Sequence, residues 1–162
     1  VITNLLILSK RGEIPKNERK DKYTHPPIEF YVNTHGGSAS DMFAIYDMMR
    51  QIRKKCEIHT IGMGKIMSAG VLLLAAGTKG QRKIGANARV MIHSVLGGSE
   101  GPLFNIQNEF EEIKFVQEAY SIALTKETNL TSKSMKELLE RHVNIYLSAE
   151  EAVKYGIADE VI

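Results

Sequence analysis

The sequence has one cysteine, no tryptophan, few prolines and little net charge. The single cysteine, Cys56, excludes an internal disulfide framework and suits the cytoplasm or an equivalent reducing compartment. The formal net charge of +2 over 162 residues is too small to predict a nucleic-acid partner. The longest apolar run, Val71 to Ala76, is far shorter than the roughly 20 residues of a membrane span. We therefore expect no disulfide, no nucleic acid and no membrane segment.

The sequence also lacks the residue groupings that hold metals or nucleotides. No cysteine or carboxylate lies at ligand-like spacing from the histidines at positions 25, 35, 59 and 142. The stretch from Gly62 to Lys65 resembles a phosphate loop, but the full spacing of Gly, four residues, Gly, Lys and Ser or Thr is absent. We therefore expect no metal ion, no nucleotide and no other cofactor.

What the sequence does contain is the composition of an ordinary globular protein, with 43% hydrophobic and 25% charged residues. Its length fits a hydrophobic core, so we expect a single domain over residues 1–162. Residues 1–8 are apolar, without an initiator Met or a basic leader, which predicts an N-terminally truncated helix or strand rather than a signal peptide. Residues 9–27 are densely charged and close with Pro26-Pro27, which predicts a solvated loop insertion.

Apolar periodicity predicts the elements of the rest of the chain. Strands are expected at residues 28–32, 58–63, 83–84, 89–93 and 157–162. Helices are expected at residues 41–53, 68–76 and 103–125, and after two capping boxes, Ser134 to Glu137 and Ser148 to Glu151. Gly156 is the expected C-terminal stop of the last helix. Because strands and helices alternate, the sequence predicts an α/β fold with mostly parallel strand pairing.

Three short segments carry the candidate chemistry, and each begins where a strand-like run ends. They contain Gly36-Gly37, Ser68 at the start of an apolar helix, and His93. Taken singly, these residues are ordinarily a plain turn, a helix N-cap and a hydrogen-bonded core histidine. At one shared sheet edge, His93 can act as base to Ser68. The N–H groups of Gly37 and Ala69 can then converge on a developing oxyanion.

In this order the segments resemble the ClpP family, the proteolytic subunits of Clp proteases. The family's Asn-Ser-Pro-Gly-Gly turn is similar to Asn33 to Gly37, and its Ser-Met-Gly before Leu-Leu-Ala-Ala-Gly is similar to Ser68 to Gly77. Its Ala-Arg-Ile-Met-Ile-His is similar to Ala88 to His93. Its Leu-Gly-Gly and its C-terminal motifs are similar to the segments Leu96 to Gly98, Leu147 to Ala152 and Tyr155 to Ile162. The likeness runs from about residue 28 to residue 162, and loosely over residues 1–8.

The resemblance implies a ClpP/crotonase-like fold of repeated ββα units and a serine endopeptidase activity. It implies that Ser68 is the nucleophile and His93 the base, and that Gly37 and Ala69 donate the oxyanion N–H groups. It also implies that Gly97 and Gly98 lie in a strand that binds extended substrate.

The resemblance further implies an assembly. Residues 103–125 become the handle helix, which docks two heptameric rings of the same chain into a closed chamber. The implied partners are further copies of the chain, a separate AAA+ Clp ATPase that unfolds substrates, and unfolded polypeptides.

The sequence departs from the family at several positions. The third catalytic residue of the family is an aspartate, and the corresponding residue here is Asn144. An asparagine still accepts a hydrogen bond from His93 but brings no negative charge, so we expect a slower enzyme. Glu140 is the alternative third residue. His142-Val143 stands where the family has the Asp and Arg that lock the rings, and Ser94-Val95 replaces the usual Gln-Pro.

Three other functions compete with the peptidase hypothesis. A degenerate, ClpR-like structural ring subunit is favoured by Asn144 and opposed by the presence of both Ser68 and His93. A crotonase-type acyl-CoA enzyme shares the fold but does not need that pair. A peptidase with a Ser-Lys pair would use Lys65. The elbow of α/β-hydrolases is not matched, since Ile66 occupies its first glycine position.

Overall fold

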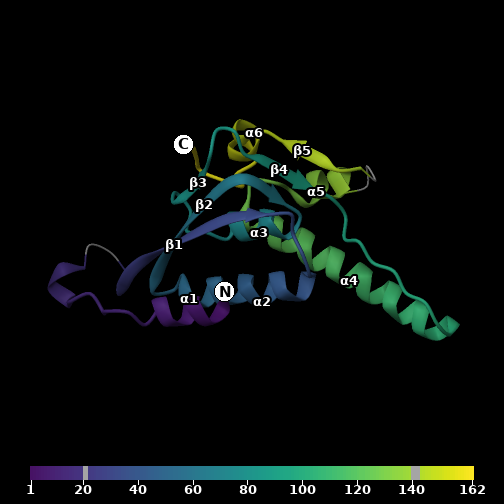
Figure 1. Cartoon of the computed structure of the whole chain (residues 1–162), viewed down its shortest axis with the longest axis horizontal. Helices are drawn as coiled ribbons and strands as arrows, with labels where there is room; N and C mark the ends of the chain where they lie inside the picture. Colours follow the sequence, from purple (N-terminus) through teal and green to yellow (C-terminus); the bar gives the residue numbers. More distant parts are fainter. Residues whose placement is uncertain (20–21, 140–142) are drawn as a thin grey trace.

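The computed structural model describes residues 1–19, 22–139 and 143–162, with helices packed against one mixed sheet (Figure 1). The strands are β1 (His25–Thr34), β2 (Cys56–Met67), β3 (Arg82–Ile84), β4 (Arg89–Ile92), β5 (Ile145–Leu147) and β6 (Glu160–Val161). The helices are α1 (Ile2–Leu8), the 3-10 turn η1 (Lys16–Glu18), α2 (Ala39–Ile52), α3 (Ala69–Ala75), α4 (Leu103–Glu127), α5 (Ser132–Leu139) and α6 (Ala149–Lys154). Across the described ranges, no helix combines the length and apolar character needed to cross a bilayer.

Strand β2 is the centre of the sheet, because β1, β3 and β4 all pair with it in parallel. Strand β3 pairs with residues 60–62 of β2, and β4 pairs with residues 65–67. Strand β6 extends the sheet in parallel from β3, and β5 pairs with β4 in the antiparallel sense. The predicted α/β class with mostly parallel pairing is therefore confirmed. Since β1, β2 and β4 run in one direction, their carboxyl ends meet at one region of the sheet.

The core lies between the sheet and the helices α2 and α3. The apolar side chains of α2 recur at helical spacing, at positions 42, 46, 49 and 52, and all four are buried. Most of the short helix α3 is also buried, including Leu72 and Leu74. These side chains pack with Ile58 and Ile66 of β2 in one apolar cluster. The packing fixes the end of β2 against the beginning of α3.

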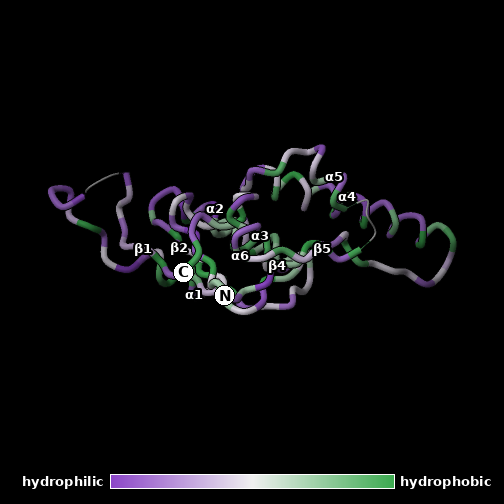
Figure 2. The backbone as a smooth tube through the Cα atoms, turned by 90° about the horizontal axis from the view of Figure 1, so that it is seen from above, coloured by the Kyte–Doolittle hydropathy of each residue, from purple (hydrophilic) through white to green (hydrophobic). Residues whose placement is uncertain are grey.

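Helix α4 has two different halves (Figures 1 and 2). Its C-terminal half contributes Tyr120, Ala123 and Leu124 to the core. Its N-terminal half projects from the sheet, and the charged residues 10–19 extend from the opposite end of the molecule. Large apolar side chains are exposed along the helix at Leu103, Phe104, Ile106, Phe110, Phe115 and Ile122. Such a run of exposed apolar groups is typical of a surface that another protein covers.

Two ion pairs, each with one buried and one partly exposed partner, connect the elements around the core. The Arg82 guanidinium binds the carboxylate of Asp159 and also donates to the backbone carbonyls of residues 75, 127 and 156. The Glu127 carboxylate accepts from Arg53 at 2.7 and 3.0 Å and from the Tyr46 hydroxyl at 2.9 Å. Pairing and hydrogen bonding of this kind are what make a buried charge tolerable.

Some boundaries differ from the sequence expectations. The capping box predicted at Ser134 to Glu137 is wrong, because Thr131 and Ser134 exchange side-chain-to-backbone hydrogen bonds one turn earlier and α5 begins at Ser132. Ser134 is therefore the partner of the capping residue Thr131 rather than the cap itself, and its hydroxyl accepts from the Thr131 N–H. The C-terminal strand covers only Glu160–Val161 of the predicted residues 157–162. By contrast, the capping box at Ser148 and Glu151 is confirmed, and so is the stop at Gly156.

Candidate active site

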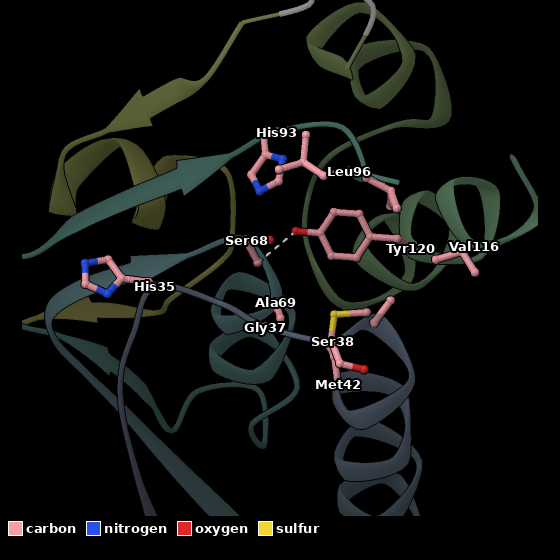
Figure 3. A pocket seen from close by; sticks show the side chains of 12 residues that line it. His35, Gly37, Ser38, Met42, Ser68, Ala69, His93, Leu96, Val116 and Tyr120 are labelled. Carbon is pink, nitrogen blue, oxygen red and sulfur yellow. Dashed lines mark hydrogen bonds between the residues drawn. The ribbon is translucent and has the colours of Figure 1, made fainter. Parts of the chain in front are cut away.

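The ends of three parallel strands bring the sequence-predicted residues together (Figure 3). Gly37 follows β1, Ser68 follows β2 and opens α3, and His93 follows β4. All three line one cavity of about 370 Å³, together with Ala69. The strand ends are therefore adjacent in space, although the segments lie up to 56 residues apart in the chain, from Gly37 to His93.

Ser68 has a strained backbone. It is the one non-glycine residue with positive φ in the described part of the chain, with φ at 54° and ψ at −119°. Its N–H donates to the carbonyl of Met91 on β4 at 2.8 Å, and its carbonyl accepts from the Val71 N–H at 3.0 Å. Its hydroxyl makes no capping bond to α3. A strained backbone conformation persists only where the surrounding contacts hold it in place, and such residues are most common at functional sites.

Two glycines allow the chain to close around Ser68. Gly36 has φ at +111°, and a Cβ atom there would lie 2.7 Å from the Cβ of Ser68. A Cβ atom on Gly70 would lie 2.5 Å from the methyl carbon of Thr34, so α3 meets the end of β1 only because residue 70 has no side chain. The Gly36-Gly37 turn therefore lies directly against the serine.

His93 is half-buried, and its Nδ1 atom lies 2.5 Å from the backbone carbonyl oxygen of Ser94. A carbonyl oxygen only accepts hydrogen bonds, so this contact requires the proton on Nδ1. The Nε2 atom of the neutral ring is then the acceptor. That is the tautomer a general base needs in order to take a proton from a serine hydroxyl.

Asn144 immediately precedes β5, which pairs with β4. In that antiparallel register Ile92 is opposite Ile145, so one further step puts Asn144 opposite His93. The Asn144 side chain is exposed, and no hydrogen bond joins it to a described residue. The carbonyl of Ser94 instead occupies the position that the third residue was expected to fill on Nδ1. The alternative third residue, Glu140, lies outside the described residues, as does His142.

The N–H groups of Gly37 and Ala69 were predicted as oxyanion donors. Both residues line the cavity beside Ser68. Neither N–H donates to a backbone or side-chain acceptor within residues 1–19, 22–139 and 143–162. For Ala69 this is expected, because the first N–H groups of a helix have no partner within it.

Apolar side chains form the other wall of the cavity. They are Met42 from α2, Val95 and Leu96 from the segment after His93, and Val116 and Tyr120 from α4 (Figure 3). This wall gives the site an apolar subsite next to the serine. Of the remaining sequence candidates, Gly97, Gly98 and Lys65 are not among the residues that line the cavity. Gly97 instead packs against Ile113 of α4, where a Cβ atom would lie 2.4 Å from the isoleucine side chain.

Sequence reasoning missed two side chains of α4 that reach the site. The Tyr120 hydroxyl donates to the Ser68 carbonyl at 3.1 Å, and the Gln117 side-chain oxygen accepts from the Val95 N–H at 2.6 Å. In the sequence, Tyr120 is one of the apolar residues that recur at helical spacing within residues 103–125. A buried tyrosine does need a partner for its hydroxyl, and that need was the available signal.

Comparison with known proteins identifies the family of this chain. A family model described as Clp protease matches residues 18–162. The chain is 39% identical over 135 residues to the ATP-dependent Clp protease proteolytic subunit 1 of Prochlorococcus marinus strain MIT 9312, covering 83% of this chain and 67% of that protein. It is 38% identical over 135 residues, with the same coverage, to the protein of that name from Prochlorococcus marinus subsp. pastoris. Together with the curled sheet and long helix, these matches confirm the ClpP/crotonase-like fold, and the chain belongs to the Clp protease family.

Proposed function

We propose that this chain is a serine endopeptidase subunit of a Clp-type protease, with Ser68 as nucleophile and His93 as general base. The observation that carries the proposal is the shared cavity. It brings the strained serine, the histidine with its Nδ1 proton held by a carbonyl, and the N–H-bearing residues Gly37 and Ala69 to one place. Nucleophile, base and oxyanion donors are the three parts that acyl transfer requires.

The chemistry follows from these positions. The Ser68 hydroxyl oxygen attacks the substrate carbonyl carbon, and the hydroxyl proton passes to Nε2 of His93. The N–H groups of Gly37 and Ala69 stabilise the resulting oxyanion. When the C–N bond breaks, the imidazolium returns the proton to the leaving amine. Water then attacks the acyl-enzyme by the same route, which releases the acid and restores Ser68.

The substrate is proposed to be unfolded polypeptide bound as an added strand. Leu96, Gly97 and Gly98 are exposed, and no backbone hydrogen bond engages them within the described chain. The backbone groups of this segment, which begins at the cavity-lining Leu96, can therefore pair with an extended peptide, which gives affinity with little dependence on sequence. The apolar wall at Met42 and Val116 favours an apolar side chain next to the scissile bond.

Asn144 is proposed to modulate this site. Its register opposite His93 lets its amide oxygen approach the imidazole when substrate binds. Because an amide is uncharged, it does not stabilise the imidazolium as an aspartate does. The proposed enzyme is therefore slower than a relative with aspartate at this position.

The assembly is proposed to be two stacked heptameric rings, with residues 103–125 as the handle between them. Support comes from the exposed apolar residues of α4, which a monomer would leave in water. An AAA+ ATPase is the proposed unfolding partner, since the similar Prochlorococcus marinus proteins are called ATP-dependent. Native mass spectrometry tests the ring. Phe104→Ser on α4 should weaken assembly, whereas Tyr31→Ser, which removes an exposed aromatic of β1, should not. A monomer at every concentration would contradict the handle role.

Labelling with a fluorophosphonate serine probe tests the peptidase proposal. We expect one adduct by intact mass, lost in Ser68→Ala and retained in Ser38→Ala, since Ser38 lines the same cavity but caps α2. Cleavage of a fluorogenic peptide should follow the same pattern. Absence of both labelling and cleavage on assembled rings would overturn the proposal and favour a structural ring subunit. The replacement of the family's aspartate by Asn144 would then be part of the loss of activity.

A further inference from the structure

Tyr120 joins the long helix α4 to the nucleophile. Its hydroxyl donates a hydrogen bond of 3.1 Å to the backbone carbonyl of Ser68 (Figure 3). The tyrosine is 4% exposed, so water competes little for this bond. Burial also raises the pKa of the Tyr120 phenol, which keeps the hydroxyl protonated as a donor around neutral pH. The bond is therefore a buried link between two elements rather than a surface contact.

The carbonyl of Ser68 and the N–H of Ala69 belong to the same peptide group. A trans peptide is planar, and its C=O and N–H point in opposite directions. A bond that holds the carbonyl oxygen therefore also sets the direction in which the Ala69 N–H points. That N–H faces no other acceptor among the described residues, and Ala69 lines the cavity beside the Ser68 side chain.

This peptide group needs support from outside its own helix. Ser68 is held in a sparsely populated backbone conformation, with φ at 54°. The Val71 N–H also contacts the Ser68 carbonyl, but Val71 belongs to the first turn of α3, a helix of 7 residues. The Ser68 N–H contact with Met91 holds the preceding peptide group instead. The Tyr120 hydroxyl adds a second hydrogen bond to the Ser68–Ala69 peptide group, and this bond comes from a separate helix of 25 residues.

We propose that Tyr120 is a positioning residue for the oxyanion site, which aims the Ala69 N–H at the attacked carbonyl oxygen by holding the Ser68 carbonyl. The proposal rests on the proposed peptidase function and adds a residue to it. It also gives α4 a direct part in the geometry of the site. Tyr120 itself touches no reacting atom.

The test is Tyr120→Phe, which removes the hydroxyl and keeps the ring. We expect kcat to fall about tenfold, less than the ~10²–10³ that follows removal of an oxyanion donor itself. KM should stay unchanged, because the oxyanion exists only in the transition state. The matched control is Tyr46→Phe, which removes another buried hydroxyl, the donor to Glu127, away from the cavity. It should leave kcat and KM as in the wild type.

A second measurement reads the peptide orientation directly. Crystal structures of the wild type and Tyr120→Phe in one crystal form should show the Ser68–Ala69 peptide rotated in the variant. An unchanged kcat, an equal loss in Tyr46→Phe, a change in KM alone or an unmoved peptide would each overturn the role of Tyr120. If the wild type neither cleaves peptide nor reacts with the probe, the peptidase function fails, and the crystal structures still decide whether Tyr120 holds this peptide.

Discussion

The side-chain oxygen of Gln117 accepts a hydrogen bond of 2.6 Å from the backbone N–H of Val95. Val95 stands two residues after His93, at a position where the ClpP family usually has proline. A proline has no N–H, whereas a valine at this half-buried position brings a donor that needs a partner. Gln117 supplies that partner and ties the segment after the histidine to α4.

Gln117→Leu should therefore destabilise the protein by only about 1 kcal/mol, because the Val95 N–H loses its partner but the Gln117 Nε2, which has no partner among the described residues, is removed as well. Combining it with Val95→Pro removes the donor as well, so the double variant should be more stable than the sum of the single changes predicts. Urea unfolding of all four proteins of this cycle measures the coupling. Strictly additive free energies would show that the bond contributes nothing.

Asn144→Asp should raise kcat about tenfold, as part of the ~10⁴ that separates aspartate from asparagine in a serine protease triad. A carboxylate opposite His93 favours the charged imidazolium, so the acid limb of the profile of kcat/KM against pH should move to higher pH. Steady-state kinetics over a pH series provides the measurement. Asn144→Ala serves as the control for loss of the amide. Identical profiles for all three proteins would leave the Ser94 carbonyl as the orienting group on Nδ1.

Gly36→Ala should abolish most of the peptidase activity and prevent labelling of Ser68. The added methyl group would lie 2.7 Å from the Cβ of Ser68, so the serine or the turn must move. Gly80→Ala is the matched control, since Gly80 also has positive φ, at +85°, but no atom lies within 4 Å of the added carbon. Both variants place an alanine in a sparsely populated backbone conformation, at a cost of about 1–3 kcal/mol each. Equal activity in the two would show that contact with Ser68 is unimportant.

Unfolding free energy should decrease in acid, partly through Asp159. Burial disfavours the charged carboxylate, but hydrogen bonds from the Arg82 side chain and from the N–H groups of Arg82 and Gly80 outweigh it and lower the pKa. A carboxyl group with a lowered folded-state pKa contributes its stability above the unfolded value of about 3.9, and that contribution is lost as pH falls through the folded value.

Asp159→Asn should therefore reduce stability near neutral pH and flatten its decline between about pH 5 and pH 2. The control is Glu160→Gln, because Glu160 is largely exposed and its nearest ion-pair partner, Lys83, is 3.7 Å away. Chemical denaturation across this pH range gives both curves. An unaltered slope in Asp159→Asn would exclude Asp159 as a source of acid sensitivity.

Interactions between residues that are close together in the chain account for what the sequence alone determined. The apolar spacing of residues 41–53 and 103–125 predicted α2 and α4 within a few residues, because a helix face repeats every 3.6 residues. Alternation of strands and helices predicted parallel pairing. The motif order predicted the family, which the comparisons confirm. The capping box at Ser148 was also predictable, since all its partners lie within three residues of one another.

Only the tertiary structure decided how the site is held. The tautomer of His93 depends on where the carbonyl of Ser94 points, and the chain direction there is set by the pairing of β4 with β2. The bonds from Tyr120 to Ser68 and from Gln117 to Val95 join residues 52 and 22 positions apart. No periodicity encodes such contacts, because they exist only after α4 has packed against α3. The sequence therefore named the candidate catalytic residues, whereas packing fixed the groups that support them.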